Sequence, residues 1–585
     1  MELLSKYIII LLCLHSTMGQ FDTGMSGDRR VIVHLFEWPF NAIKEECKMV
    51  LGPQKFGGVL VQSVNEHILI KKAGNIRRPW YERYQPLSWD IISRLGTEQQ
   101  FKEMVEECNK NDVRVYVDTV LNHATGSIYG GVVEGVGGTR ADVNFKSYPG
   151  LGFNRENFHT TCQINWKDKI TVRNCELSGL QDVDQSQEYV RGKIVEYLNK
   201  LISYGVAGFR VDAAMHMWPK DLQAIYSKLR DVSLNDGKTT FRPTWMLEVH
   251  DEDGSYQDDY KDIGSEYEFE FLARVKRVFK KMDSSLASIY QYVKQPRYLS
   301  KKRVALTSNQ DEQRREWIDR FSSEPDRSGV QQPENATVMY RIFEKALTEM
   351  TFSRPVVDAF ILTFTTDIPS IFSGYSYTDQ NAGPPMNEET EEIKNPLNCS
   401  DGWMCEHRFK PLQWIIKFFT NFVQDAPVET WFSDWTNGSP LQAAFIRGKK
   451  GFAVFNADVK SLKQTFKVPL PAGVYCDLAT GYFCQHHQMC MGGLKRRVEV
   501  KEDGSIEVSL PGMIRSSNNC TAPATEPPYL AISLQSKYPD PETPNPIVET
   551  IGWIVLAVAV VVGVGVVTWF LCRQSKSNRE IQLVV

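Results

Sequence analysis

The sequence of 585 residues predicts an α/β fold: a (β/α)8 TIM barrel with an irregular domain inserted after strand 3, a C-terminal antiparallel β-sandwich domain and one C-terminal transmembrane helix. Continuous apolar runs alternate with amphipathic helical patterns through most of the chain, which is typical of a parallel sheet covered by helices. Nearer the C-terminus the helical patterns give way to short β-runs, and an uncharged apolar segment lies close to the chain end.

Residues 1–19 predict a secretory signal peptide, because Lys6 precedes a short apolar run that ends in small residues. All of the 12 cysteines except Cys13 and Cys572 fall in the predicted extracellular part. Their even number predicts that they pair in disulfides, as expected in an oxidising compartment. Asn335 and Asn437 begin plausible sequons for glycosylation.

The barrel is expected to comprise residues 20–121 and 183–425. Its strand-like runs are VIVHLFEW, GGVLVQS, VRVYVDTV, GFRVDA, TWMLEV and RVALTSN, with amphipathic patterns such as EQQFKEMVEECNK between them. Repeated units of this kind favour the barrel architecture. The interval 122–182 interrupts the rhythm, since it is polar and Gly-rich and carries Cys162 and Cys175, and we interpret it as the inserted domain.

The remaining segments complete the predicted organisation. Residues 426–537 contain short runs such as FAVFNA and SIEVSL and predict the β-sandwich. Residues 538–550 are Pro-rich and predict a stalk. Residues 551–572 are uncharged and long enough to cross a bilayer, and the basic tail 573–585 that follows predicts a cytoplasmic end. The chain is therefore predicted to be a single-pass type I protein of the cell membrane.

Charge and aromatic content bear on the class of partner. The net charge of −4 gives no basic field for nucleic acid, and we expect no nucleic-acid partner. Aromatic residues make up 11% of the chain, a share that suits large cores or stacking surfaces.

Charged residues stand at the ends of the predicted strands. In GFRVDA, Arg210 and Asp212 lie two positions apart and so share one face of a buried strand. Unpaired buried charges are very unfavourable, so a structural ion pair is the simplest interpretation of these two alone. Asp118, Glu248 and Asp311 also follow strand-like runs, and the carboxyl ends of barrel strands meet at one mouth. Opposed carboxylates beside an Arg are the equipment of a glycosidase.

The motifs VYVDTVLNH, GFRVDAAMH, MLEVHD and SNQDEQR resemble, in order, the four conserved segments of animal-type α-amylases in glycoside hydrolase family 13. The resemblance runs from about Gln20 to Lys537 and implies a membrane-tethered, extracellular, retaining α-1,4-glucan hydrolase. Its substrates would be starch, glycogen and maltooligosaccharides, cleaved endo-wise. The resemblance also implies that Asp212 is the nucleophile, that Glu248 is the acid and later the base, and that Asp311 grips sugar hydroxyls.

The same resemblance implies a set of substrate-binding residues. Trp80, Tyr81 and Tyr84 match the family's stacking platform, and the neighbouring arginines favour an exposed rim over an aromatic core. The whole implied set is Arg210, Asp118, His123, Trp80, Tyr81, Tyr84, Gln85, Gln310 and His216.

A calcium ion is implied by the family pattern. Its ligands would be the side chains of Asn122 and Asp182 and the main-chain carbonyls of Arg173 and His216, and oxygen donors of this kind suit Ca²⁺. The family's disulfides imply the pairs Cys47–Cys108, Cys162–Cys175 and Cys399–Cys405. Cys476 would pair with Cys484 or Cys490, leaving Cys520 for the other.

Several positions depart from the family pattern. Gln310 stands where the family has His, and Met215 stands where it has Lys. Of the family's chloride ligands, Arg210 and Asn309 remain, but no Lys or Arg lies between Pro355 and Ile393 to complete the site, so chloride activation is not expected. A longer, charged loop also follows the fourth motif. Two alternatives therefore stay open: an α-glucosyl transferase, and a catalytically weakened glycan-binding or scaffold ectodomain.

Overall fold

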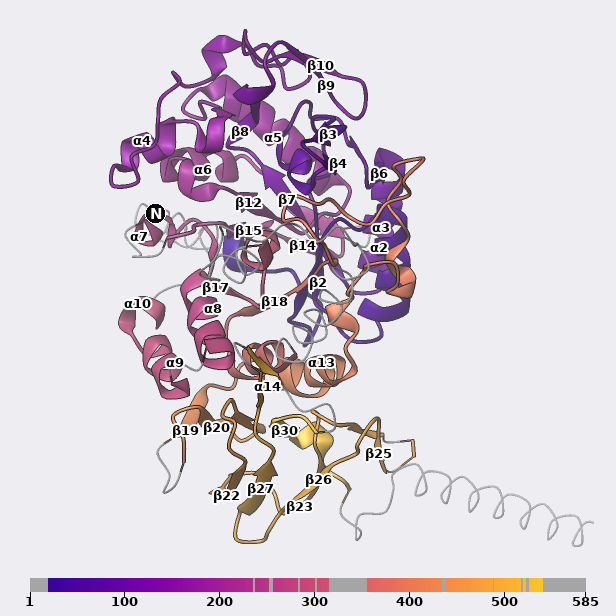
Figure 1. Cartoon of the computed structure of the whole chain (residues 1–585), viewed down its shortest axis with the longest axis vertical. Helices are drawn as coiled ribbons and strands as arrows, with labels where there is room; N and C mark the ends of the chain where they lie inside the picture. Colours follow the sequence, from indigo (N-terminus) through magenta and orange to yellow (C-terminus); the bar gives the residue numbers. More distant parts are fainter. Residues whose placement is uncertain are drawn as a thin grey trace, which may run out of the picture.

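The computed structural model describes residues 19–234, 237–251, 256–281, 285–299, 302–314, 355–433, 438–484, 486–487, 489–516, 519–521 and 526–539. In Figure 1 the barrel lies in the middle, the segment inserted into it lies above, and the C-terminal β domain lies below. Nearly all of the predicted signal peptide and both predicted glycosylation sites, Asn335 and Asn437, lie outside the described residues.

Eight parallel strands close into a barrel, which confirms this part of the predicted fold class. In spatial order they are β1 (Ile32–Leu35), β18 (Ile368–Ser373), β17 (Arg303–Leu306), β16 (Ser265–Tyr267), β15 (Thr244–Leu247), β12 (Gly208–Asp212), β7 (Arg114–Val120) and β2 (Gly58–Val61). β16 and β18 were not among the predicted runs. β16 is only three residues long and has Glu266 at its centre, so it lacks the continuous apolar run of its neighbours.

Helices surround the barrel and bury one face each against it. α3 begins after Thr97, whose side chain forms a capping box with Gln100, and it buries Phe101, Val105 and Cys108. α3 itself spans Glu98–Lys110. The other α-helices include α2 (Phe40–Glu46), α4 (Lys169–Asn174), α5 (Glu188–Ser203), α6 (Pro219–Ser227), α7 (Gln257–Tyr260), α8 (Phe269–Lys276), α9 (Leu286–Val293), α10 (Pro296–Leu299), α13 (Lys410–Ile415) and α14 (Asn421–Val423).

The segment between β7 and β12 forms small sheets and loops above the barrel mouth. Its first strand, β8 (His123–Gly126), pairs antiparallel with its last, β11 (Leu180–Asp182), so that the two ends of the insertion lie together. β9 (Val132–Glu134) and β10 (Arg140–Asp142) form a separate hairpin. The buried carboxylate of Glu66 accepts hydrogen bonds from two amides of the Gly-rich loop, those of Gly137 and Thr139, and anchors that loop on the barrel.

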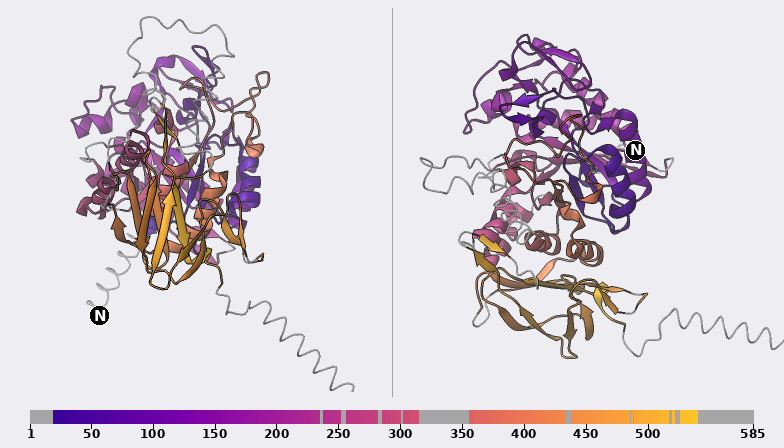
Figure 2. Two further views of the ribbon diagram at one scale, coloured as in Figure 1. Left: turned by 60° about the horizontal axis from the view of Figure 1, so that its bottom comes forward. Right: turned by 45° about the vertical axis from the view of Figure 1, so that its right-hand side comes forward.

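The C-terminal domain is a β-sandwich, as predicted. One sheet has the order β19 (Val428–Phe432), β20 (Gln442–Arg447), β21 (Gly451–Asn456), β30 (Tyr529–Ser533), and the other β22 (Leu462–Lys467), β27 (Ser505–Leu510), β26 (Arg497–Val500), β23 (Gly473–Cys476). Both views in Figure 2 show these strands beside the barrel end that lies away from the insertion. Phe452 and Phe466 meet across the two sheets with ring centroids 5.4 Å apart.

Short two-stranded sheets complete the strand inventory of the described residues. They are β3 (Lys72–Ala73) with β4 (Ile76–Arg77), β5 (Ile92–Ser93) with β6 (Gly96–Thr97), β13 (Val232–Leu234) with β14 (Thr239–Phe241), β24 (Tyr482–Cys484) with β25 (Met489–Met491), and β28 (Ile514–Ser516) with β29 (Asn519–Thr521).

Four disulfides link the described cysteines. The pairs Cys47–Cys108, Cys162–Cys175 and Cys399–Cys405 are confirmed. Of the two alternatives for Cys476, the partner is Cys490. Cys484 is unpaired among the side chains that the structure describes, and the side chain of Cys520 is not one of them.

The membrane part of the predicted fold class needs correction. Across the described part of the chain, no helix has both the length and the apolarity that crossing a bilayer requires. The segment 551–572 and the tail 573–585 lie outside the described residues, as does most of the stalk at 538–550. The fold is therefore corrected to a barrel with an inserted segment and a C-terminal β-sandwich, and the prediction of a single-pass membrane protein is withdrawn.

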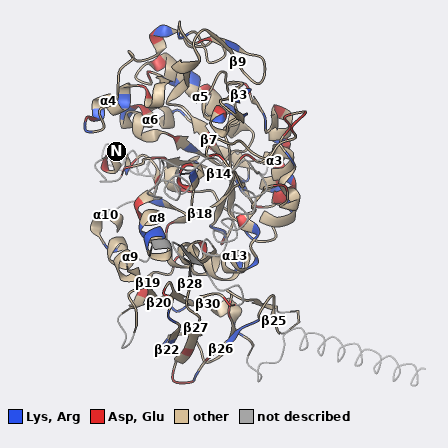
Figure 3. Ribbon diagram, viewed as in Figure 1, with Lys and Arg blue, Asp and Glu red and all other residues tan. Residues whose placement is uncertain are grey.

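Charged side chains of both signs are interspersed over the described elements (Figure 3). Ion pairs such as Lys193–Glu196 and Lys467–Asp503 join partners on the surface, where each contributes little to stability. Other ion pairs have buried partners, among them the pairs of Arg210 and of Glu46.

Candidate active site

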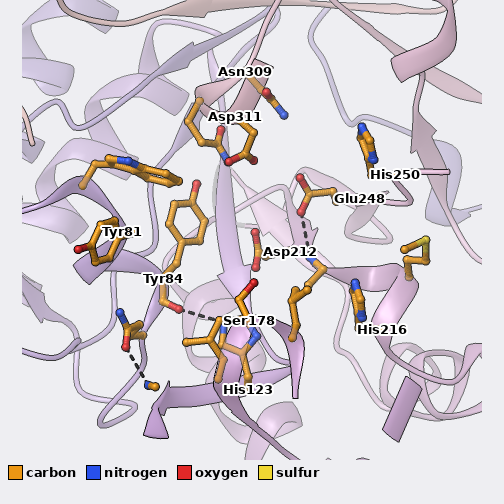
Figure 4. Close-up of a pocket in the computed structure, with 18 of the residues that line it drawn as sticks. Tyr81, Tyr84, His123, Ser178, Asp212, His216, Glu248, His250, Asn309 and Asp311 are labelled. Carbon is orange, nitrogen blue, oxygen red and sulfur yellow. Dashed lines mark hydrogen bonds between the residues drawn. The ribbon is translucent and has the colours of Figure 1, made fainter. Parts of the chain in front are cut away.

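A cavity of about 640 Å³ opens at the carboxyl ends of the barrel strands, between the barrel and the inserted segment. Figure 4 shows Asp212 at its centre, with Tyr81 and Tyr84 on one side and Glu248, His216 and His250 on the other. The residues that line it are Trp80, Tyr81, Tyr84, Gln85, His123, Gly126, Ile128, Tyr129, Trp166, Leu177, Ser178, Leu180, Asp212, Ala213, Met215, His216, Glu248, His250, Phe269, Asn309, Gln310, Asp311 and Glu312. The cavity thus contains all three residues predicted to be catalytic.

The turn after β12 places Asp212 at the cavity floor. Arg210 and Asp212 point to one face of the strand, and the chain reverses immediately afterwards at Ala213, which has φ +49°. This left-handed conformation costs a non-glycine residue about 1–3 kcal/mol, and such strain is usually retained for a functional reason. Here it aims the Ala213 N–H at Glu248 Oε2, 3.0 Å away, so the turn also orients Glu248.

One guanidinium, that of Arg210, faces three carboxylates. Its Nη1 lies 2.5 Å from Asp118 Oδ1 and 2.8 Å from Asp212 Oδ1, and its Nη2 lies 2.6 Å from Glu248 Oε1. Arg210 is 3% exposed, so water contributes little screening. Since one positive charge cannot balance three buried negative charges, the cluster is expected to retain a proton at neutral pH.

The pKa shifts show where that proton lies in the resting site. Burial, and then the charge of Glu248, raises the pKa of Asp212 well above its usual value. Burial alone would raise the pKa of Glu248 too, but Arg210 and the Ala213 N–H outweigh it and lower that pKa. Glu248 also interacts directly with Asp212. The two carboxyl groups therefore behave as a pair that shares a proton, and in the absence of a sugar the proton belongs mainly to Asp212.

The aromatic side of the cavity is the 3-10 helix η3 (Trp80–Tyr84). Trp80 and Tyr84 pack edge to face with centroids 5.6 Å apart. The Tyr84 hydroxyl donates to Asp118 Oδ2 at 2.9 Å, and His123 Nε2 donates to the Tyr84 carbonyl at 3.0 Å. Burial lowers the pKa of His123 to about 4, so this imidazole is neutral at neutral pH.

The expectation that this stretch forms an exposed rim needs correction. Tyr84 is buried, and so are Arg78 and Arg83, which pair with Glu82 and Glu37 respectively. These acidic partners pull the arginines inward. Trp80 and Tyr81 remain half-buried, and all three rings of the predicted platform line the cavity.

The fourth motif forms one wall. Asn309 Oδ1 accepts the N–H of Glu312 at 2.7 Å and caps the short helix at 310–314. Gln310 is 1% exposed, and its Oε1 has no hydrogen-bond partner among the described residues. Asp311 and Glu312 line the cavity beside it. Gln85, the remaining predicted contact, accepts the N–H of Gly126 through its Oε1 at 2.9 Å.

The predicted calcium ligands lie where the insertion joins the barrel. Asn122 Oδ1 and Asp182 Oδ1 are buried and have no hydrogen-bond partner among the described residues. His216 Nδ1 donates to the Val172 carbonyl at 2.8 Å, which brings the turn at His216 beside Arg173. Burial raises the pKa of Asp182 to about 7. The other oxygen of Asp182, Oδ2, lies 2.6 Å from His159 Nδ1. The two buried oxygens without a partner, one on Asn122 and one on Asp182, fit a cation that prefers oxygen ligands.

The two predicted chloride ligands differ in how far their donors are used. Arg210 Nη1 lies at ion-pair distance from Asp118 and Asp212, whereas its buried Nη2 lies 2.6 Å from Glu248 Oε1 without a hydrogen-bond partner among the described residues. Asn309 uses its side-chain oxygen as a helix cap, which leaves its N–H groups as donors.

Sequence reasoning missed part of the cavity wall. His250 and Phe269 lie next to Glu248, with ring centroids 4.7 Å apart. His250 follows Glu248 by two positions and could have been found from the motif. Phe269 follows β16, the strand that the sequence did not reveal. Trp166 of the insertion, 59% exposed, also lines the cavity.

Comparisons with known proteins place these features in context. Residues 89–245 match the model of the α-amylase catalytic domain, and residues 432–514 match that of the α-amylase C-terminal all-β domain. An α-amylase-related protein of Drosophila pseudoobscura pseudoobscura is 35% identical over 505 residues, 84% of this chain and 93% of the relative. The protein of that name from Drosophila melanogaster is 35% identical over 508 residues, 85% of this chain and 94% of the relative.

Among solved structures, α-amylase I of Eisenia fetida superposes with a TM-score of 0.71 in a mutant complexed with maltohexaose. The two sequences are 28% identical, and the match covers 88% of this chain and 99% of the other. The wild-type enzyme gives a TM-score of 0.70.

Proposed function

The chain belongs to the α-amylase family, glycoside hydrolase family 13, and from this premise we propose that it is a retaining hydrolase of α-1,4-glucans that works through a covalent glycosyl-enzyme. The observation that supports this most directly is the cluster of Asp118, Asp212 and Glu248 around Arg210, at the floor of a cavity flanked by aromatic rings. Starch, glycogen and maltooligosaccharides are the substrates, cleaved within the chain.

In the first step the sugar ring enters between Asp212 and Glu248 and separates them. The shared proton moves to Glu248, whose carboxyl group donates it to the glycosidic oxygen as the bond to C1 breaks. The ionised Asp212, paired with Arg210, bonds to C1 at the same time. The shortened glucan leaves with the proton on its new hydroxyl, and the other part stays esterified to Asp212.

In the second step a water molecule enters on the leaving-group side. Glu248 is now ionised and held by the Ala213 N–H, and it takes a proton from the water. At the same time the oxygen of the water bonds to C1. The bond between C1 and Asp212 breaks, and the original protonation of the pair returns. Asp311 and Gln310 are placed to hold hydroxyls of the reacting ring throughout.

Calcium has a supporting part in this proposal. Asn122 and Asp182 would hold the ion through their side chains, and Arg173 and His216 would hold it through their carbonyls. A bound cation would balance the Asp182 carboxylate and fix the insertion to the barrel. His123 follows Asn122, and His216 is itself a predicted ligand, so a bound ion would also hold these two histidines in the cavity wall.

The test is a product profile of the full chain on glycogen and on maltotriose to maltoheptaose, with Asp212→Asn as the inactive reference. Internal cleavage with retention of the α-configuration supports the proposal. Longer products than substrates would instead identify the α-glucosyl transferase.

One observation favours a second candidate, a glycan-binding protein with weak turnover. Arg210 lies 2.6 Å from Glu248 and lowers its pKa, which opposes the role of Glu248 as an acid. If maltohexaose binds the wild-type protein but no reducing ends appear, this second function is correct and hydrolysis is not.

A further inference from the structure

A buried arginine, Arg314, connects the two sides of the cavity from behind. It is 5% exposed and is the last described residue of the helix that carries Gln310 and Asp311. Its Nη1 donates to the Gln310 carbonyl at 2.9 Å, and its Nε donates to the Gln380 carbonyl at 2.8 Å. That same carbonyl accepts the indole N–H of Trp80 at 3.1 Å. Arg314 therefore shares an acceptor with one ring of the aromatic platform and bonds to the first residue of its own helix, which carries Gln310 and Asp311 into the cavity wall.

The guanidinium also packs on the platform itself. Its Cζ lies 4.5 Å from the centroid of the Trp80 ring and 4.9 Å from that of Tyr377. Tyr377 in turn donates its hydroxyl to the carbonyl of Gln313, and Arg314 Nη2 bonds to the Tyr375 hydroxyl at 3.1 Å. A cation held over an indole face is attracted by the ring's quadrupole. These contacts fix the orientation of the Trp80 ring relative to the helix at 310–314.

The groups that contact the Arg314 guanidinium are uncharged hydrogen-bond acceptors and aromatic rings. Within the described ranges, no carboxylate lies at ion-pair distance from it, so carbonyls, a hydroxyl and ring faces satisfy the guanidinium. A planar fork with five N–H groups can meet such a set, whereas a lysine amine with the same charge cannot reach all of it.

We propose that Arg314 is a positioning residue, which sets the separation between the stacking face of Trp80 and the pair Gln310–Asp311. The inference rests on the proposed function, since it assumes that a glucan lies along the cavity. A chain of sugars gains its full binding energy only if the ring and the polar wall are both in place when it arrives. Arg314 does not line the cavity, so its effect reaches the sugar through Trp80 and Gln310.

Arg447 offers a matched control. It is 1% exposed and donates to the main-chain carbonyls of Ala426, Thr363 and Thr365, at the junction of barrel and β-sandwich. Its chemistry is that of Arg314, but the residues whose carbonyls it bonds, which also include Val423, do not line the cavity. Arg447→Lys therefore reports what the loss of a buried guanidinium fork does to stability alone.

The experiment compares wild type with Arg314→Lys, Arg314→Met and Arg447→Lys. Steady-state kinetics are measured on maltohexaose, which can span both sides, and on 4-nitrophenyl α-glucoside, whose single sugar cannot. For Arg314→Met we expect kcat/KM on maltohexaose to fall at least about tenfold, mainly through KM, with a much smaller change on the glucoside. Arg314→Lys should recover only part of the loss. Arg447→Lys should lower the melting temperature and leave both KM values unchanged.

Calorimetric binding of maltohexaose to Asp212→Asn, with and without Arg314→Met, separates this inference from the proposed function. Weaker binding with Arg314→Met supports the inference even if the wild-type protein proves unable to cleave glucans. Equal losses on both substrates, full recovery by lysine, or unchanged maltohexaose affinity would each overturn it. Wild-type protein that binds no maltohexaose would overturn both proposals.

Discussion

Two clusters of polar and charged side chains in this molecule have opposite ratios of hydrogen-bond donor residues to carboxylates. In the cavity, Arg210 alone faces Asp118, Asp212 and Glu248. Behind α2, Glu46 alone accepts from two donors, His407 Nε2 at 2.9 Å and Arg408 Nε at 2.8 Å. The cavity cluster is poor in positive charge and borders open space, whereas the Glu46 cluster has a surplus of donors for one carboxylate.

The pKa shifts of the two clusters follow from this difference. Burial and the neighbouring carboxylate raise the pKa of Asp212. Burial would also raise the pKa of Glu46, but His407 and Arg408 outweigh it and lower that pKa. At neutral pH the raised pKa of Asp212 therefore lowers the stability of the fold, and the lowered pKa of Glu46 raises it. The comparison teaches that a carboxylate cluster used for proton transfer is one that the protein leaves incompletely neutralised.

The same contrast explains why the Glu46 cluster is no second active site. His407 Nδ1 also bonds to the Ser373 hydroxyl at 2.9 Å, so a serine, a histidine and a glutamate form a chain of hydrogen bonds. That composition is found in nucleophilic enzymes. However, all three residues are 0–1% exposed, and none lines the cavity. These hydrogen bonds between Ser373, His407 and Glu46 therefore hold β18 against α2.

The largest effect is expected for Asp212→Asn. The amide cannot act as a nucleophile, so turnover on maltohexaose should fall at least about 10⁴-fold, equivalent to about 5.5 kcal/mol. The same change removes a carboxyl group whose ionisation the fold disfavours, so the melting temperature at pH 7 should rise. The gain should shrink as the pH falls toward the ordinary value of 3.8, because Asp212 is then protonated in the unfolded chain as well as in the fold. A less stable variant at pH 7 would contradict the comparison.

Glu46→Gln is expected to have the opposite profile. It leaves His407 and Arg408 without their carboxylate, and breaking a buried pair in this way costs about 3–5 kcal/mol. Because the folded pKa of Glu46 lies below its ordinary value of 4.5, its contribution is complete above that pH and is lost as the pH falls through the folded pKa. Chemical denaturation from pH 3 to 8 measures this. The kcat of the folded fraction should be unchanged, and a large fall would place the cluster in the reaction.

Calcium removal is expected to have a smaller effect. A ligand that binds only the native state at 100 times its dissociation constant stabilises it by about 2.7 kcal/mol. Chelation should therefore lower the melting temperature and activity together, as scanning calorimetry and a reducing-sugar assay would show. Asp182→Asn should lose this response, while Asp184→Asn, beside it but outside the predicted ligand set, should keep it. A wild-type protein indifferent to chelation would contradict the calcium site.

The sequence could predict the buried strands that consist of continuous apolar runs. Because the carboxyl ends of barrel strands lie together, it could also predict that Asp118, Arg210, Asp212 and Glu248 are close to one another. It could not predict features that depend on distant partners. β16 was missed because a charged residue stands at the middle of a very short strand. The buried state of Arg83 depends on Glu37, 46 positions earlier, and the position of Arg314 depends on Gln380, 66 positions later. Such contacts form only when the barrel closes and brings distant segments together, so no local sequence pattern predicts them.

Gln310→His is expected to have the smallest effect on activity, and it tests how the charge balance of the cavity affects turnover. Gln310 is buried, and its Oε1 lacks a partner among the described residues, so this side chain is not fully used. An imidazole at this position can donate to a sugar hydroxyl with a different reach and angle. We expect a gain in kcat of roughly tenfold, or about 1.4 kcal/mol, with little change in KM, as for a contact made mainly in the transition state.

The pH dependence of that gain distinguishes a better hydrogen bond from added charge. A neutral imidazole leaves the cluster around Arg210 short of positive charge, so Glu248 and Asp212 continue to share a proton. A protonated one would stabilise both carboxylates as anions and would repel the positive charge that develops on the sugar ring. The gain should therefore be complete above the ordinary histidine pKa of about 6.5 and should disappear below it. Kinetics of both proteins on maltohexaose from pH 5 to 8 measure this. A gain that instead grows as the imidazole becomes charged would show that the cavity benefits from a second cation, and the difference between the two clusters would then not be what enables proton transfer.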